Sequence, residues 1–348
     1  MRIAFFNKIE EEDKIRCERL FDIVCENTKD IEIIALAKSI NDLKKSLESG
    51  QIDDVQEALD EHPIVLLNDH GKGHIQRVLE RADDLIKLMG EEGLSPYECY
   101  ILYCAILVHD VGILDGRAGH TNRVKRFLYA SCKEVLKDGF EREFISKIAS
   151  AHGGSINGDK DTISALPVTT PLNCKEIRAR LLAAILRFAD ELADDSSRQK
   201  LDPKFLEKVP QESLIYHYYS KCLHSVLLKT DDYINYVVLT YALTIEDALK
   251  KFDAVGGERF LLDEIFARTL KMEVERRYCN KFFVPKLFID RIEVQINIFD
   301  EVNYDVDLPC IEYILEEKGY PTKLESVNTV WTGESLKKHL ESKYKEIT

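Results

Sequence analysis

The strongest constraint on the fold is a run of ten apolar residues, Cys99 to Val108, that ends directly on His109 and Asp110. A buried helix that ends on an imidazole and a carboxylate holds two groups whose burial is costly unless they are paired or bind a metal. Histidine together with aspartate suits a divalent transition metal, and protein-bound metals of this kind commonly serve hydrolysis. We therefore expect a helical core with a metal centre at the end of this helix.

The composition excludes several classes of protein. With 348 residues, 45% of them hydrophobic and 32% charged, the chain has the profile of a globular protein with room for two domains. A net charge of -14 argues against a broad basic surface for duplex DNA, although it leaves room for a local basic pocket. The apolar runs are too short to span a bilayer, and the first residues lack the apolar core of a signal peptide.

The nine cysteines show no Cys-x-x-Cys spacing, and several of them lie in apolar helical stretches. This usage indicates reduced thiols in a core rather than a disulfide or zinc framework. We therefore expect a cytoplasmic protein that contacts neither membranes nor duplex nucleic acid.

Three segments differ in their pattern along the chain. Residues 1–62 are charged with helical period, and we expect two or three helices there. Residues 63–211 carry the long apolar helices. From residue 212 onwards Tyr-rich and β-branched runs indicate a smaller α+β domain. Its expected strands and helices are 225–228, 233–241, 259–279 (helix), 291–298, 308–318 (helix) and 334–345 (helix).

Within residues 63–211 apolar periodicity predicts a succession of helices. Ser95 and Pro96 resemble an N-cap followed by proline in the first turn, so the buried helix should begin there. Residues 153–172 form a long polar loop of the kind that often carries binding groups. The expected helices begin near residue 73 and then cover 97–110, 120–138, 140–152 and 174–194.

Five of the nine histidines fall between residues 70 and 152, each beside a helix end or a glycine. Two aspartates, Asp110 and Asp190, end the two most apolar helices. Histidines scattered over a surface would not collect at such positions, so these residues are the candidates for chemistry. The five histidines are His70, His74, His109, His120 and His152.

In this order and context the chain resembles the HD-domain metal-dependent phosphohydrolase superfamily, over roughly residues 64–200. His74 stands in Gly-His-Ile-Gln-Arg-Val, the pair His109-Asp110 in Ile-Leu-Val-His-Asp-Val-Gly, and Asp190 in Leu-Arg-Phe-Ala-Asp-Glu-Leu. The family's fold is a helical bundle with ligands in its centre. The resemblance thus implies a mainly α fold: an HD-type bundle with a smaller C-terminal α+β domain.

The resemblance also implies that His74, His109, Asp110 and Asp190 bind one divalent metal. Such a metal leaves positions open for water and a phosphate oxygen, and it activates the water. Ligands of mixed nitrogen and oxygen type accept manganese, iron, nickel, cobalt, zinc or magnesium, so the identity of the metal stays open.

His120 and His152 stand between the pair and the last aspartate. In some family members histidines there hold a second metal or contact the substrate phosphate, and either residue could act in catalysis beside Asp110. For His120 the alternative is simple packing at the start of a helix. His70 either touches the substrate or is an ordinary loop histidine.

Phosphate must be held by cations, and arginine suits bidentate contact with it. Two departures from the family leave the substrate class open. Ile113 stands where many members carry lysine, and Ala151 rather than a second histidine precedes His152. The candidate phosphate-binding residues are Lys72, Arg77, Arg123 and Arg187.

The sequence therefore predicts an enzyme that hydrolyses a phosphate ester or anhydride in a small phosphorylated molecule, with a nucleotide as the expected substrate and manganese as the first metal to test. Two alternatives remain open. The bundle could be a nucleotide-sensing or partner-docking module with little turnover, or it could be a nuclease acting on single strands. The C-terminal domain could form a homo-oligomer in any of these cases.

Overall fold

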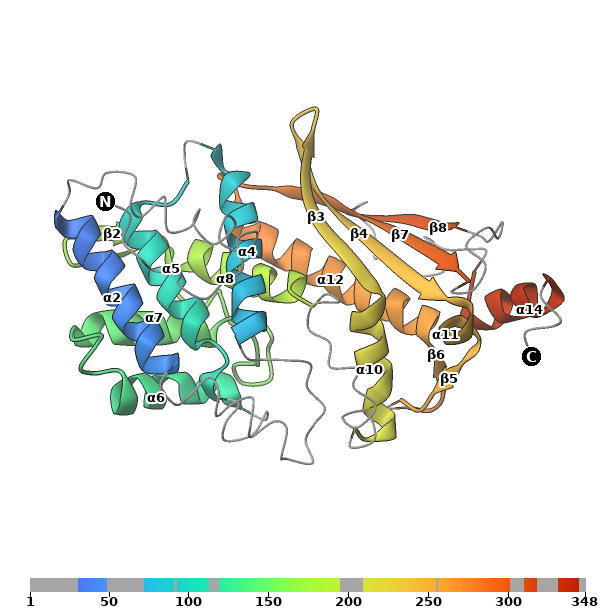
Figure 1. Ribbon diagram of the computed structural model, residues 1–348. Helices are drawn as coiled ribbons and strands as arrows, with labels where there is room; N and C mark the ends of the chain where they lie inside the picture. Colours follow the sequence, from blue (N-terminus) through green and yellow to red (C-terminus); the bar gives the residue numbers. More distant parts are fainter. Residues whose placement is uncertain are drawn as a thin grey trace. The chain divides into compact units, whose positions relative to one another are not determined.

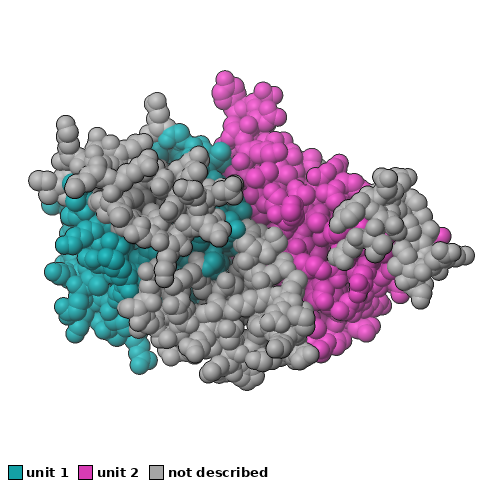
Figure 2. Space-filling view, in the orientation of Figure 1, with its two compact units in different colours: residues 1–61, 70–193, 279–287 teal, residues 62–69, 194–278, 288–348 magenta. Residues whose placement is uncertain are grey.

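The computed structural model describes residues 31–48, 72–90, 93–112, 119–194, 209–254, 256–300, 310–317 and 331–343. The chain divides into two compact units, one of residues 1–61, 70–193 and 279–287 and the other of residues 62–69, 194–278 and 288–348 (Figure 2). The predicted fold class is confirmed, because the chain is mainly helical with a smaller C-terminal α+β part. The three-part division at residues 62 and 211 stays a prediction.

The first unit is built around α5, Pro96–Val108, whose side chains are buried without exception from Tyr97 to Val108. A helix that is apolar all round must be covered on every side, and α2, α4, α7 and α8 pack against it (Figure 1). The start predicted from Ser95 and Pro96 is confirmed by a capping box between Ser95 and Glu98. The other helices of this unit are α2 (Ile31–Glu48), α4 (Lys72–Lys87), the short 3-10 helix η3 (His120–Arg123), α6 (Val124–Ser131), α7 (Gly139–Ser150) and α8 (Ala179–Leu192).

One buried carboxylate fixes the starts of two of these helices. Glu98 accepts a hydrogen bond from the backbone of Ser95 at 2.9 Å and two from the Arg178 guanidinium at 2.8 and 2.7 Å. Arg178 is the N-cap residue of α8, and its backbone N–H also donates to Glu98, at 3.0 Å. Because α5 leads to His109 and α8 carries Asp190, this pair sets where both candidate ligand segments lie.

Two predicted helices of the first unit were too long. The helix expected over 120–138 consists of η3 and α6, and residues 132–138 form a turn. The helix expected over 174–194 begins only at Ala179. Before it, β1 (Thr170–Leu172) and β2 (Lys175–Ile177) form a hairpin. Asn173 and Cys174 have φ of 49° and 60° at its turn, a conformation that ends helical periodicity and favours a tight hairpin.

The second unit contains a four-stranded sheet in the order β3-β4-β7-β8. The central pair β4 and β7 is parallel and is connected through α12, while both outer pairs are antiparallel. Tyr313 of β8 packs its ring on Phe266 of α12 and hydrogen-bonds Thr269 at 2.8 Å, so one face of the sheet is covered by that helix. The last residues of α12, from Cys279 onwards, belong to the first unit.

Figure 1 labels the helices and strands of the C-terminal part. They are α10 (Gln211–Cys222), β3 (Leu223–Asp231), β4 (Ile234–Thr244), α11 (Ile245–Leu249), β5 (Lys251–Phe252), β6 (Arg259–Phe260), α12 (Leu261–Phe283), β7 (Ile289–Phe299), β8 (Cys310–Glu316) and α14 (Gly333–Lys343).

The helix expected over 308–318 was wrong, because Cys310–Glu316 form strand β8. Ile311, Tyr313 and Leu315 are buried while the residues between them are exposed, which is the two-residue period of a strand. The run is short, and pairing with β7 decides its state. The expected helix over 334–345 is confirmed as α14.

Two further expectations concern the described residues only. None of their helices is long and apolar enough to cross a membrane. The seven cysteines among them are free thiols, five of them buried.

The Glu98–Arg178 pair yields a test of the fold. Replacing Glu98 by glutamine keeps its size but leaves the Arg178 guanidinium without a charged partner, so we expect the free energy of unfolding at pH 7 to fall by about 2–3 kcal/mol. Urea unfolding measures it, with the exposed Glu134→Gln as a matched control.

The same variant should change the pH dependence of stability. Burial raises the pKa of Glu98, but hydrogen bonds from Arg178 and Ser95 outweigh it and hold that pKa below its usual value. The stabilisation is therefore complete above the unfolded pKa of about 4.3 and is lost as the pH falls through the folded pKa. A difference between Glu98→Gln and the parent that stays constant down to about pH 3 would contradict this account.

Candidate metal centre

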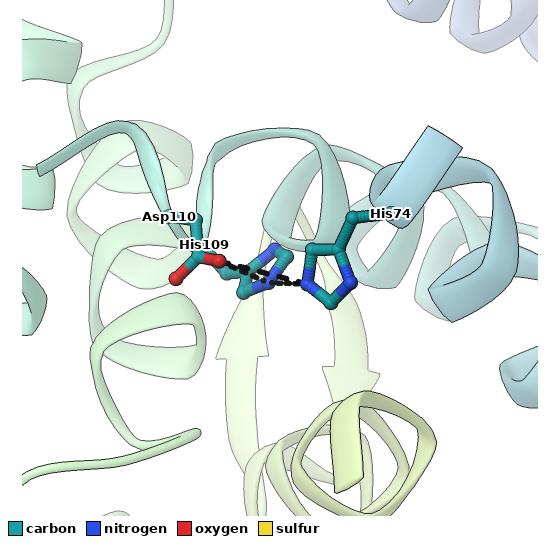
Figure 3. Close-up of side chains that lie close together, drawn as sticks. All are labelled: His74, His109 and Asp110. Carbon is teal, nitrogen blue, oxygen red and sulfur yellow. Dashed lines mark hydrogen bonds and ion pairs between the residues drawn. The ribbon is translucent and has the colours of Figure 1, made fainter. Parts of the chain in front are cut away.

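The predicted ligands converge from separate helix ends. His74 lies in the first turn of α4, His109 and Asp110 directly follow the last residue of α5, and Asp190 lies in the last turn of α8. His109 still has helical backbone angles, φ -60° and ψ -36°, and it forms a turn with Asp110, so the adjacent pair lies where α5 ends. Figure 3 shows the rings of His74 and His109 turned toward the Asp110 carboxylate.

Four donor atoms form a tight group. Nε2 of His74 lies 3.2 Å from Nε2 of His109, 3.5 Å from Oδ2 of Asp110 and 3.1 Å from Oδ1 of Asp190. Nε2 of His109 lies 3.4 Å from the same Asp110 oxygen and 3.6 Å from the same Asp190 oxygen. Both imidazoles are fully buried, and the Asp190 side chain is 28% exposed. The group is therefore enclosed on the side of the histidines and open toward Asp190.

Hydrogen bonding fixes which nitrogen of His109 is available. Its Nδ1 lies 2.7 Å from the carbonyl oxygen of Ile106, which can only accept. Nδ1 therefore carries the proton, and in the neutral ring Nε2 keeps its lone pair and faces the other donors. This is the arrangement of a histidine that binds a metal through Nε2.

The spacing fits one ion. Donor atoms bound at about 2.1 Å to a single metal lie about 3.0 Å apart along an octahedral edge and about 3.4 Å along a tetrahedral edge. The distances of 3.1 to 3.6 Å within the group lie around the tetrahedral edge and above the octahedral one. The residues thus fit a divalent metal, and the donor atoms of His74, His109 and Asp110 lie within 4.8 Å of one another.

The electrostatics of the group favour a positive charge at its centre. Burial lowers the pKa of His109, but the Asp110 and Asp190 carboxylates outweigh it and raise that pKa well above its usual value. Burial raises the pKa of Asp190, yet hydrogen bonds with His109 and His74 hold it well below its usual value. Without a metal a proton supplies the positive charge, and a metal must displace it.

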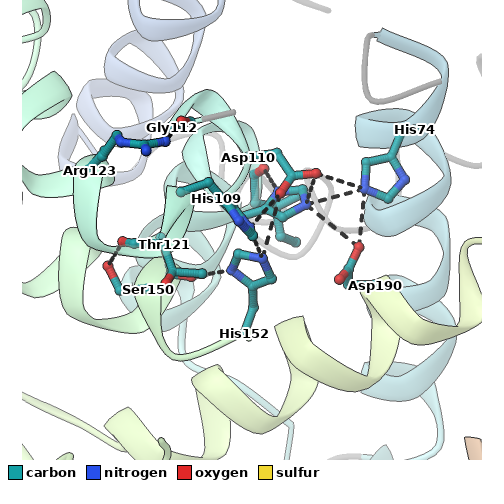
Figure 4. A network of polar contacts seen from close by, with 12 residues as sticks. His74, His109, Asp110, Gly112, Thr121, Arg123, Ser150, His152 and Asp190 are labelled. Atoms are coloured by element: carbon teal, nitrogen blue, oxygen red, sulfur yellow. Dashed lines mark hydrogen bonds and ion pairs between the residues drawn. The ribbon is translucent and has the colours of Figure 1, made fainter. Parts of the chain in front are cut away.

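A second group of donors lies on the other side of Asp110. Its Oδ1 is 3.4 Å from Nε2 of His120 and 3.6 Å from Nε2 of His152, and these two nitrogens are 3.3 Å apart. The carbonyl oxygen of Ala149 lies 2.5 Å from Nδ1 of His152, so Nε2 of this ring also keeps its lone pair. The Asp110 carboxylate is therefore shared between two pairs of imidazoles (Figure 4).

Backbone contacts that the sequence analysis missed hold this second group. Ser150 donates to the carbonyl oxygen of Thr121 at 2.6 Å, which joins the end of α7 to η3 (Figure 4). Arg123 donates to the carbonyl oxygen of Gly112 at 2.8 Å. A Cβ on Gly112 would lie 2.1 Å from the carbonyl oxygen of His120, so only glycine allows this approach. Of these contacts, only Gly112, which closely follows His109-Asp110, was marked in the sequence.

The candidate phosphate-binding arginines have neighbours within the protein. Arg77 pairs with Glu80 at 2.7 Å, and the buried Arg187 donates to Thr162 at 3.0 Å and to the Lys160 carbonyl at 3.1 Å. Since Thr162 in turn donates to the Ala151 carbonyl, Arg187 supports the loop that follows His152.

The described part of the structure does not cover two of the predicted residues. His70 and the side chain of Lys72 lie outside the described residues. The roles of the arginines, His70 and Lys72 toward substrate all stay predictions.

Metal titration tests the centre directly. We expect the parent protein to bind Mn²⁺ by isothermal titration calorimetry, and His109→Ala and Asp190→Ala to weaken that binding roughly 100-fold or more, because each removes a donor. The exposed His224→Ala, on β3, is the matched control.

The affinity of the parent should also fall as the pH is lowered, because protons compete with the metal for His109. Equal affinities in His109→Ala and His224→Ala would show that the ion binds elsewhere.

Comparisons with known proteins place this geometry in a family. No curated protein matches the chain in sequence. A sequence model of the family described as HD-CE matches residues 65–274, a span that contains all six donor residues. HD-CE is related to the HD domains, so the expected relationship is confirmed at that level. Because the match covers more than half of the 348 residues, the chain belongs to the HD-CE family.

Proposed function

We propose that this protein is a metal-dependent phosphohydrolase that cleaves a phosphate ester or anhydride in a nucleotide. The observation that carries the proposal is the sharing of the Asp110 carboxylate between two pairs of imidazoles, with Asp190 completing one side. In a structural metal site four protein ligands fill the coordination sphere and close it to water. Here Asp190 is partly exposed, and two further histidines, His120 and His152, face the same carboxylate.

The residues divide into two roles in this proposal. His74, His109, Asp110 and Asp190 would hold the metal. The chemistry that such an ion supplies when bound is activation of water and neutralisation of the charge that develops on the phosphoryl group. His120 and His152 face the same carboxylate from the other side, where they either hold a second ion or handle a proton of the reaction.

Exposure distinguishes the two histidines. The His120 side chain is 19% exposed, whereas that of His152 is 5% exposed and hydrogen-bonded through Nδ1. A group that donates a proton to a leaving group must be reachable by substrate. We therefore assign His120 as the proton donor and His152 as the residue that orients it across the 3.3 Å contact. Arg123 shares η3 with His120, so it is our first candidate for the phosphate contact.

Product analysis tests the reaction class. The protein is incubated with Mn²⁺ and a panel of nucleoside mono-, di- and triphosphates, cyclic nucleotides and cyclic dinucleotides, and products are identified by mass spectrometry. We expect one class to yield product, and Asp110→Ala and Asp190→Ala to lose at least about 10³-fold in kcat/KM, because both remove metal ligands.

Folding of the variants is checked by circular dichroism. If the metal-loaded protein binds a nucleotide tightly but releases no product, the result would favour nucleotide sensing over hydrolysis. Full activity in Asp190→Ala would refute the assignment of the ligands.

The two histidines give a second test. We expect His120→Asn to lower kcat roughly 10²–10⁴-fold while the first metal still binds. The variant should also lose the fall in rate at high pH that a proton donor produces in a pH–rate profile. The same substitution at His224 is the control. A second equivalent of metal in the parent that disappears in both His120→Asn and His152→Asn would instead assign the pair to a second ion.

A further inference from the structure

A basic and aromatic surface covers α6, the start of α7 and the turn between them, which all belong to the first unit. Figure 1 shows where the two helices lie. It lies outside the metal centre and plays no part in the proposed reaction. We call it the α6–α7 surface. Its exposed cationic and aromatic residues are Lys125, Arg126, Tyr129, Lys133, Lys137 and Phe140, and Glu134 is the exposed carboxylate among them.

The charge of this segment is opposite to that of the chain. Between residues 123 and 142 there are six cationic residues and three anionic ones, which gives a net charge of +3. Since the whole chain has a net charge of -14, the remaining residues have a net charge of -17. The six are Arg123, Lys125, Arg126, Lys133, Lys137 and Arg142, and the three are Glu134, Asp138 and Glu141.

Most of the anions are already engaged. Asp138 caps α7 by accepting from the backbone of Phe140 at 2.7 Å. Glu141 accepts from Tyr97 at 2.5 Å and from Tyr100 at 3.2 Å. Among the residues that the structure describes, no carboxylate forms an ion pair with Arg126, Lys133 or Lys137. These three exposed cations are therefore available to an anionic partner.

Two aromatic side chains lie on the same surface. Phe140 is 79% exposed in the first turn of α7, and Tyr129 of α6 is 41% exposed. The Tyr129 hydroxyl donates to the carbonyl oxygen of Gly139 at 3.2 Å, which holds its ring beside the residue that precedes Phe140. The Arg142 guanidinium lies 5.1 Å from the centre of the Tyr129 ring. Exposing a phenylalanine to this degree gains nothing in folding, so its ring is available for stacking.

We propose that the α6–α7 surface binds single-stranded nucleic acid. Arg126, Lys133 and Lys137 contact the backbone phosphates, while Phe140 and Tyr129 stack on bases. Cations that follow a backbone together with exposed aromatic rings are the combination that single strands require, because every base offers a face for stacking. A duplex hides those faces, and an acidic peptide has no use for the exposed rings.

The position of the surface relates it to the metal centre. α6 begins directly after η3, which carries His120, and Arg126 is six residues further on, or about 9 Å along a helix. A strand on this surface that extends to Arg126 therefore comes near the segment that carries His120, whereas Lys133, Lys137 and Phe140 lie beyond the far end of α6. Binding is independent of the reaction, whereas cleavage of the bound strand would rest on the proposed function.

Fluorescence anisotropy tests the binding. A labelled oligo(dT) of about 12 nucleotides is titrated with the full chain in EDTA, so that no metal-dependent cleavage can interfere. We expect the double variant Lys133→Ala/Lys137→Ala to weaken binding. The slope of log K against the logarithm of the salt concentration should become shallower by about 1.4, since each lost phosphate contact contributes about 0.7 to that slope. Phe140→Ala should weaken binding about tenfold, and Phe140→Tyr should restore it.

Matched controls make the outcomes decisive. Lys38→Ala/Lys45→Ala removes the same charge from the exposed face of α2 and should leave binding unchanged. Asp190→Ala should also bind normally, which separates this surface from the metal centre. The proposal is overturned if the parent does not bind oligo(dT), if both lysine pairs have equal effects, or if polyglutamate competes as well as the strand and Phe140→Ala has no effect.

Discussion

The sharing of one carboxylate is the interaction on which the candidate site depends. Asp110 places Oδ2 near His74 and His109, and Oδ1 near His120 and His152. Each of these imidazoles is largely withdrawn from water, so a negative charge and a balancing positive charge must be present together. Asp110 comes two residues after the end of α5, while His120 begins η3 and His152 follows the end of α7, so the two pairs reach its carboxylate from different elements.

Long-range contacts place the ends of the other segments. Glu98 ties the start of α5 to the start of α8, so the two helices share an origin and their far ends carry His109 and Asp190. The contact of Gly112 with the His120 backbone and the Ser150–Thr121 hydrogen bond hold η3 and the end of α7. Contacts that do not involve the donor atoms therefore hold the site in place. Such support keeps the facing imidazoles in position before any metal binds.

Much of the candidate site could be predicted because its chemistry leaves a local trace. A polar pair at the end of an apolar run marked His109 and Asp110, and the geometry brings His74, Asp190, His120 and His152 to the same place. The contact between Glu98 and Arg178 spans 80 residues and has no local trace. In the fold, the strand at 310–316 was missed because the exposed Ile314 hides the alternation of apolar and polar residues, and the pairing with β7 is a long-range contact.

Anomalous diffraction from crystals grown with Mn²⁺ tests the central claim most directly, because it locates the ion without reference to activity. The account predicts a strong peak enclosed by Nε2 of His74, Nε2 of His109, an Asp110 oxygen and Oδ1 of Asp190, at about 2.0–2.3 Å from each. A peak between Asp110, His120 and His152 as well would add a second ion. Metal at some other place, with these four donors bonded only to one another, would contradict the account.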